Sequence, residues 1–106
     1  MPRYLVETYV PRTDADAARA AGRRARAAAR QLSREGKSVR YVRTTFLPRD
    51  ETCFHIFEAG SEQDARNAAA RAGIQPERVL EATNFEATRV QLARSARGTR
   101  DARQRT

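Results

Sequence analysis

The sequence has few of the residues that most often carry chemistry: it contains one cysteine, one histidine and no tryptophan in 106 residues. A single cysteine excludes a disulfide within the chain and fits a reducing cytoplasm, which is the localisation we predict. No run approaches the roughly 18 consecutive apolar residues of a membrane span, and residues 1–10 lack the apolar segment of a signal peptide. There is no glycine-rich phosphate loop, His-Glu-x-x-His or paired Cys-x-x-Cys motif. The sequence therefore offers no catalytic signature.

Large apolar residues are also scarce, since Leu, Ile, Val and Phe together number 17. With a net charge of +8, this composition approaches that of disordered chains, but periodic patterns are clear up to about Thr83. One subunit has little apolar surface to bury, so we predict a homodimer that hides one face of a sheet. The basic residues are almost all arginine, since Lys37 is the only lysine. A genome of suitable base composition also enriches its proteins in arginine and alanine. The high pI is therefore only weak evidence that the protein binds nucleic acid.

The patterns of apolar residues predict an α+β fold in the order β-α-β-β-α-β, the ferredoxin-like arrangement, with a four-stranded antiparallel sheet and two helices on one face. Residues 1–84 form this predicted domain. Residues 85–106 are predicted to be a basic extension, helical at first and disordered beyond Arg97. In chain order, the predicted elements are a strand at 3–10, a helix from 13 or 14 to 35, a hairpin at 38–58, a helix from 61 to 72 and a strand at 78–83.

The hairpin is predicted from two runs of β-branched and aromatic residues around the turn signal at 47–51. Pairing Leu47 with Thr52 sets the register, and a slip of one residue would exchange the two faces. On the side under the helices, this register pairs Phe46 with Cys53, Thr44 with His55 and Val42 with Phe57. On the free side it pairs Thr45 with Phe54, Arg43 with Ile56 and Tyr41 with Glu58.

The free side of the sheet carries the candidate functional residues. The first strand adds Glu7 and Tyr9, which join Tyr41 and Arg43 as candidate catalytic residues. A carboxylate, a guanidinium and two phenols among apolar walls suit a small polar or aromatic ligand, and a partly buried Glu7 with a raised pKa is a candidate general acid or base. Alternatively, Glu7 and Arg43 form an ion pair buried by dimerisation. The candidate ligand-binding residues are Phe54, Ile56 and Glu58.

His55 and Cys53 are the only, and weak, candidates for metal ligation. In the predicted register both face the helices, where a lone histidine is usually a hydrogen-bonded core residue and a cysteine a small buried hydrophobe. They are not expected to form a nucleophilic pair, because neighbours two apart on a strand project in parallel and no third group orients them.

Two basic features have alternative interpretations. Arginines at positions 19, 23, 26 and 30 recur at helical spacing, either to meet phosphates or as a solvated helix face. From Thr88 onward there are six arginines and one aspartate, which indicate either a segment for nucleic acid or an acidic partner, or a solubilising end.

The segments MPRYLVETYVP, SVRYVRTTFLPRDETCFHIFEA and ARNAAARAGIQPERVLEA resemble a small bacterial family of unknown function that includes a nickel-responsive actinobacterial protein. The resemblance spans residues 1 to about 83 and implies a ferredoxin-like fold, commonly dimeric, with nickel bound by some members. Members of the family that look like metal binders have histidines on the first strand, in the helices and often on the second strand. The matching positions of this sequence hold Thr8, alanines of the two helices and Arg43. His55 lies at a position where relatives often have cysteine. A nickel site needs several imidazole, carboxylate or thiolate ligands, so nickel rests on the resemblance alone and the cofactor is left unknown.

We therefore predict a small dimeric ligand-binding or regulatory domain with a pocket on the free sheet face. One alternative is a dimeric α+β-barrel enzyme that acts on a small organic substrate with Glu7 as acid or base. A second is nucleic-acid binding through the arginine-rich helix face and the basic extension. It ranks lower, because FHIFEAG lacks the glycine and basic residues of RNA-recognition sheets. No membrane partner is expected.

Overall fold

The computed structural model describes residues 1–85, which hold the strands and helices predicted for the ferredoxin-like domain. The predicted helical and disordered extension falls on residues 85–106, nearly all of them outside the described part. The strands and helices are β1 (Arg3–Tyr9), α1 (Ala15–Arg34), β2 (Val39–Leu47), a short 3-10 helix (Pro48–Asp50), β3 (Thr52–Ala59), α2 (Glu62–Arg71) and β4 (Arg78–Ala82).

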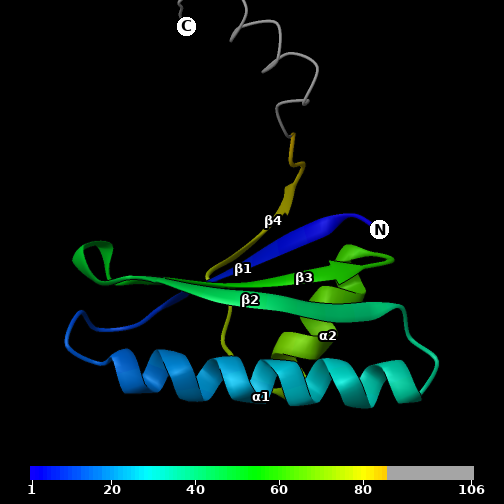
Figure 1. Cartoon of the computed structure of the whole chain (residues 1–106), viewed down its shortest axis with the longest axis horizontal. Coiled ribbons are helices and arrows are strands. Elements are labelled where there is room, and N and C mark those ends of the chain that lie inside the picture. The colour runs from blue at the N-terminus through cyan, green and yellow to red at the C-terminus, as the bar shows by residue number, and fades with distance from the viewer. Residues whose placement is uncertain (86–106) are drawn as a thin grey trace, which may run out of the picture.

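The four strands form one antiparallel sheet in the order β2-β3-β1-β4. Both helices lie on the same side of this sheet, and no helix of residues 1–85 lies over its other side (Figure 1). The predicted ferredoxin-like fold is thus confirmed, as is the prediction that the first strand neighbours the third. Within residues 1–85, none of the helices combines the length and the apolar content needed to cross a membrane.

Both helices begin and end at the residues that the sequence signals indicate. Asp14 caps α1 by accepting the backbone N–H of Ala17 at 3.0 Å, and Ser61 caps α2 in the same way at 3.1 Å. These side chains satisfy backbone donors that have no partner inside the helix. The chain leaves each helix at a glycine with positive φ, Gly36 and Gly73, because glycine adopts this conformation without a steric penalty.

The core lies between the sheet and the two helices, and alanine supplies the helix side of it. Alanines of both helices, among them Ala25 and Ala68, are fully buried against strand residues such as Val6 and Phe57. Because a methyl group is short, the helices approach the sheet closely. The helices are also held to each other, since Arg24 Nε donates to the carbonyl of Ala72 at 2.8 Å.

The hairpin register is as predicted between Arg43 and Leu47 and differs before Arg43. A β-bulge lies at Val42, so that Tyr41 pairs with Phe57 and Arg40 pairs with Glu58. A bulge sets two residues against one and therefore reverses the alternation of faces on the residues beyond it. The prediction that Tyr41 shares the free face with Arg43 is thus wrong. Both Tyr41 and Val42 can pack in a core, which is why alternation alone did not reveal the bulge.

We predict that Ala68→Leu destabilises the fold by roughly 1–3 kcal/mol, since the added carbons have no space between α2 and the sheet. Chemical denaturation monitored by circular dichroism measures this difference. Ala70→Leu, at an exposed position of the same helix, is the matched control and should change stability by less than about 0.5 kcal/mol. Equal losses in both variants would show that the helix does not pack through its alanine face.

Candidate functional site

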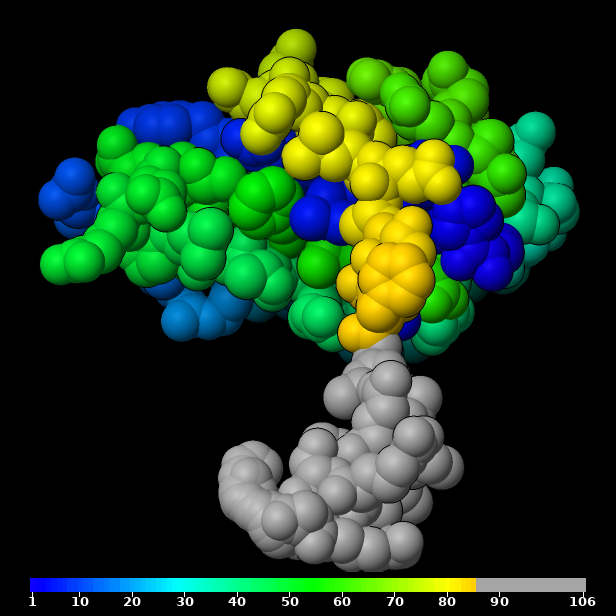
Figure 2. All heavy atoms as spheres, turned by 90° about the horizontal axis from the view of Figure 1, so that it is seen from above, coloured from blue at the N-terminus to red at the C-terminus, as the bar shows by residue number. Residues whose placement is uncertain are grey.

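The free face of the sheet has an apolar centre. Leu5 lies opposite Ile56 on β3 and Leu80 on β4, and Phe54 lies beside them. Neither α1 nor α2 covers these side chains, and they are half-buried except for Ile56, which neighbouring side chains leave only 9% exposed. Figure 2 looks down onto this side of the molecule, where the β4 segment, in yellow to orange, runs across the view with atoms of β1, in blue, on both sides of it.

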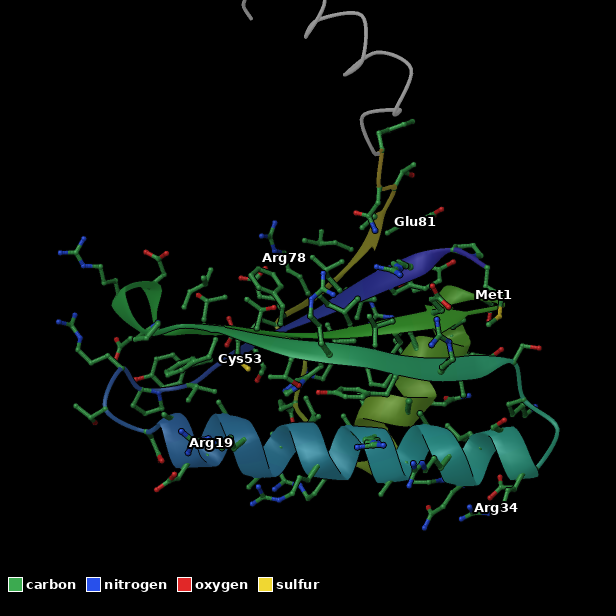
Figure 3. The ribbon with its side chains drawn as sticks, viewed as in Figure 1. Met1, Arg19, Arg34, Cys53, Arg78 and Glu81 are labelled. Atoms are coloured by element: carbon green, nitrogen blue, oxygen red, sulfur yellow. The ribbon has the colours of Figure 1, made fainter. Side chains whose placement is uncertain are left out.

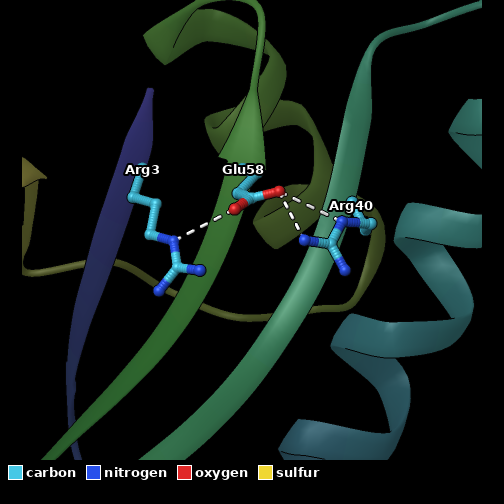
Figure 4. Close-up of polar contacts among 3 residues, drawn as sticks. All are labelled: Arg3, Arg40 and Glu58. Carbon is cyan, nitrogen blue, oxygen red and sulfur yellow. Dashed lines mark hydrogen bonds and ion pairs between the residues drawn. The ribbon is translucent and has the colours of Figure 1, made fainter. Parts of the chain in front are cut away.

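Glu58 binds two arginines at one end of this face. Its carboxylate accepts a hydrogen bond from Arg3 Nε on β1 at 3.1 Å and two from Arg40 on β2 (Figure 4). The hydrogen bonds from Arg40 and then from Arg3 hold the pKa of Glu58 below its ordinary value. Glu58, predicted as a ligand-binding residue, is therefore a carboxylate already shared between two guanidinium groups.

Glu7 is paired at the other end of the face, but its partner is on β4. Arg78 Nη2 lies 2.8 Å and Nε 3.0 Å from one Glu7 oxygen. The predicted pair with Arg43 is wrong, because β3 separates the strands of these two residues whereas Arg78 is directly across from Glu7. Arg78 was visible in the sequence as the first residue of the last strand, but its register relative to Glu7 was not.

The structure divides the predicted site residues between two sides of the sheet. Glu7, Phe54, Ile56 and Glu58 share the free face. Arg43 joins them from the edge strand β2, and Tyr9 is at the end of β1 with its side chain 57% exposed. The bulge turns Tyr41 to the helix side, where its ring meets Phe57 edge-on with 6.0 Å between the centroids. The two phenols that the enzyme alternative requires around one substrate are thus separated by the sheet.

A chain of hydrogen bonds lies on the helix side. The Tyr41 hydroxyl and Thr44 Oγ1 share a hydrogen bond of 2.6 Å, and Thr44 Oγ1 and His55 Nδ1 share one of 2.8 Å. The other ring nitrogen of His55 is 3.8 Å from Cys53 Sγ. Figure 3 shows Cys53 between the sheet and α1. His55 and Cys53 thus occupy the core positions that the register predicts, and the histidine is hydrogen-bonded there.

Gly22 of α1 makes room for these hydroxyl groups. A Cβ at this position would lie 2.8 Å from Thr44 Oγ1, closer than real contacts of this kind, and 3.2 Å from the Tyr41 hydroxyl, which is a tight contact. Sequence reasoning missed this contact, although a single glycine inside an otherwise alanine-rich helix was a signal for close packing.

His55 is neutral under ordinary conditions. Burial, together with the nearby charge of Arg24, lowers its pKa to about 4. Removal of the ring from water disfavours the charged form, and a neighbouring cation adds to this effect. Burial also raises the pKa of the Cys53 thiol, so neither group has the reactivity of an activated nucleophile.

The donor set does not fit a nickel ion. Nowhere in residues 1–85 do three histidine, cysteine, aspartate or glutamate side chains come together in a group that suits a metal. His55 already bonds Thr44, and the sulfur of Cys53 lies in a closed core. A first-row metal requires several such ligands around one centre.

A groove that the sequence did not predict runs between α1 and β2. It has a volume of about 530 Å³ and is lined by arginines of both elements, with the Tyr41 and Thr44 side chains at its wall. It opens at the edge of the sheet rather than on the free face.

Comparison with known proteins identifies one family and one fold. The family model described as nickel responsive protein SCO4226-like matches residues 4–82. The crystal structure of SCO4226 from Streptomyces coelicolor A3(2) is similar with a TM-score of 0.62 and 13% sequence identity, covering 79% of this chain and 99% of that one. At this identity the likeness shows the fold alone. No curated protein sequence matches the chain.

We predict that the protein loses about 2 kcal/mol of stability between pH 7 and pH 5 through His55. Its folded pKa of about 4 lies below the ordinary 6.5, so below pH 6.5 the unfolded chain takes up a proton that the folded chain does not, and stability falls as the pH falls. Urea denaturation at the two pH values measures the loss. His55→Gln, which removes the single histidine, should lack this dependence; an unchanged dependence would assign it to other groups.

We predict that Gly22→Ala destabilises the protein by roughly 1–2 kcal/mol despite the better helix propensity of alanine, because its methyl group clashes with the Thr44 hydroxyl. In a Thr44→Ala background the same change should be nearly neutral, giving a coupling of more than about 1 kcal/mol. Thermal denaturation of the four proteins in this cycle provides the measurement. Additive effects would show that the two positions do not touch.

Proposed function

The chain belongs to the family of nickel responsive SCO4226-like proteins, and from this premise we propose that it is a small ligand-binding and regulatory domain that acts as a homodimer. Two copies pair through the free faces of their sheets and enclose a ligand pocket between them. The observation that carries this proposal is the apolar centre of that face, formed by four large side chains that neither α1 nor α2 covers.

The composition of the chain makes this surface unusual. Large apolar residues are few, yet Leu5, Phe54, Ile56 and Leu80 are placed on the side without helices. Full burial of such a side chain stabilises a protein by about 1.5–3 kcal/mol. A second copy with the same face would bury the whole group at once, and a twofold pairing presents identical patches to each other.

The charged residues on this face suit burial in an interface. Glu58 accepts hydrogen bonds from Arg3 and Arg40, and Glu7 accepts them from Arg78, within one chain. A paired carboxylate enters an interface without leaving an isolated buried charge. The two ion-paired clusters lie at opposite ends of the apolar centre, so they also restrict how two copies can be placed against each other.

The ligand would lie against Phe54 and Ile56 of both copies. Arg43 is exposed at the rim of the face, and no acidic side chain within residues 1–85 forms an ion pair with it. It is therefore the available group for a carboxylate or other polar end of a small molecule. We also place the protein in the cytoplasm, where its single thiol would stay reduced.

The enzyme alternative has less support in this geometry. The Glu7 carboxylate already accepts a hydrogen bond from Arg78 Nε and forms an ion pair with its guanidinium, so a substrate would have to displace this group to use Glu7 as an acid or base. Tyr41, the second phenol of the candidate catalytic group, points to the helix side. The response to nickel that gives the family its description would not run through a metal held by His55 and Cys53.

We predict that Leu5→Lys converts the dimer into a monomer, because it places a charge at the centre of the buried apolar patch. Native mass spectrometry of freshly purified protein reports the number of subunits and any retained small molecule or metal in one measurement. Ala70→Lys, on the exposed side of α2, is the matched control and should remain dimeric. Circular dichroism verifies that both variants are folded.

A parent protein that is monomeric at micromolar concentration would overturn the proposal, as would a dimer that survives Leu5→Lys. A retained small molecule that is lost in a folded, dimeric Arg43→Ala variant would support the pocket. If Arg43→Ala retains the ligand, the pocket does not use the rim arginine. Stoichiometric nickel that disappears in His55→Ala would contradict our interpretation of the core histidine.

A further inference from the structure

A second surface of the protein is separate from the proposed dimer face and has a different electrostatic character. The groove between α1 and β2, of about 530 Å³, is lined by Arg19, Arg23 and Arg26 of the helix and by Arg43 of the strand. A smaller hollow of about 260 Å³ shares Arg26 and Tyr41 with it and continues along the helix to Arg30. The two together follow the edge strand along much of α1.

The arginines of α1 are not scattered over its solvent side. At about 100° per residue, five of the six fall within a sector of roughly 80° that adjoins the groove. The exposed positions next to that sector carry no charge, as at Ala27 and Gln31. The row thus places most of the positive charge of α1 on the part of its exposed surface that borders the two hollows. The five arginines are Arg19, Arg23, Arg26, Arg30 and Arg34.

Most of these guanidinium groups have no acidic partner. Arg19 pairs with Asp16, but within the part of the chain that the structure describes, Arg23, Arg26 and Arg30 take part in no ion pair. The lining of both hollows contains no aspartate or glutamate. This contrasts with the free face, where each glutamate of the two ion-paired clusters is bonded to arginine.

The arrangement suits a linear chain of phosphates better than a single small anion. Arg19 and Arg34 lie near the two ends of α1 (Figure 3), about 22 Å apart at 1.5 Å per residue. Neighbouring arginines of the row are about 5–6 Å apart at Cβ. Arginine recognises phosphate oxygens through its planar set of donors. A single small anion would contact only one or two of these guanidinium groups, and the charges of the others would remain without a counter-charge.

The groove has no aromatic ring free to stack on a base. Tyr41 is held by Phe57 and Thr44, and Phe46 packs against the buried pair of Val10 and Cys53. We propose that the α1–β2 groove binds a single strand of nucleic acid through its phosphate backbone, without reading the bases. The groove lies outside the proposed dimer face, except that Arg43 borders both, so a dimer would carry two such sites.

Fluorescence anisotropy of a labelled single-stranded DNA of about 15 nucleotides tests the proposal. With three to four phosphate contacts, log Kobs should fall against log salt with a slope of about −2 to −3. Arg23→Gln/Arg26→Gln should weaken binding at low salt by about tenfold or more and reduce the slope by about 1.4, because two contacts are lost. Glutamine preserves the helix and most of the side-chain length.

Two controls remove the same charge elsewhere. Arg12→Gln/Arg49→Gln changes exposed arginines that line neither hollow, and Arg100→Gln/Arg103→Gln changes the basic end of the sequence. Both should keep the parental slope and bind within about threefold of the parent. Oligonucleotides of different base sequence should bind alike.

Equal weakening in all three double variants would show attraction by net charge only and overturn the proposal. Loss confined to Arg100→Gln/Arg103→Gln would move binding to the basic end, with the same consequence. Competition by millimolar inorganic phosphate at an ionic strength matched with chloride would show a site for a small anion instead. A strong preference for one base sequence would contradict backbone recognition.

Discussion

The close contact between the alanine faces of two helices and the sheet is the constraint on which the rest of the structure depends. It is possible because Ala25, Ala65, Ala68 and Ala69 add almost no thickness between the layers. The short distance leaves little space on the helix side, so the hydroxyl groups of Tyr41 and Thr44 fit there only where α1 has a glycine. His55 is consequently sealed in the core in its neutral form, and the chain's single histidine serves packing and hydrogen bonding.

An alanine core has a second consequence on the other side of the sheet. Each buried methyl contributes little hydrophobic stabilisation, so a single copy of this chain depends on few large side chains. Several of those, including Ile56 and Leu5, lie on the face without helices. The high alanine content lets the helices pack closely against one side of the sheet. Because it also leaves large apolar side chains partly exposed on the other side, it favours a partner there. A second copy is the simplest partner, because it has the same apolar centre. Its charged residues on this face are already paired with each other within the chain.

Helix ends and most of the hairpin register could be predicted from the sequence because each depends on local signals, and the strand order followed from the β-α-β-β-α-β succession of elements. Caps and glycines set the helix ends, and the turn after Leu47 sets the pairing as far as Arg43. The bulge at Val42 could not be predicted, since Tyr41 and Val42 are interchangeable in an alternation of apolar and polar residues. The partner of Glu7 was missed for a different reason: Arg78 lies 71 positions away, and only the register of the last strand brings it opposite. The groove between α1 and β2 could not be predicted for the same reason, because its walls come from two elements whose relative position only the fold determines.

Arginine has two distinct roles in this protein, and the pairing of its charge separates them. On the sheet face, Arg3, Arg40 and Arg78 are bonded to glutamates, which makes these groups compatible with burial. Along α1, Arg23, Arg26 and Arg30 have no such bonds among the described residues and line concave surface. A high content of arginine by itself distinguishes neither role, and composition alone gave only weak evidence for a nucleic-acid partner. The distribution of acidic residues distinguishes most of these arginines: glutamates are bonded to the arginines beside the apolar centre, whereas no aspartate or glutamate lines either hollow. Arg19 and Arg40 also line the hollows and are paired with Asp16 and Glu58. The pairing of charge is therefore the feature that separates the surface we propose for self-association from the groove we propose for an anionic chain.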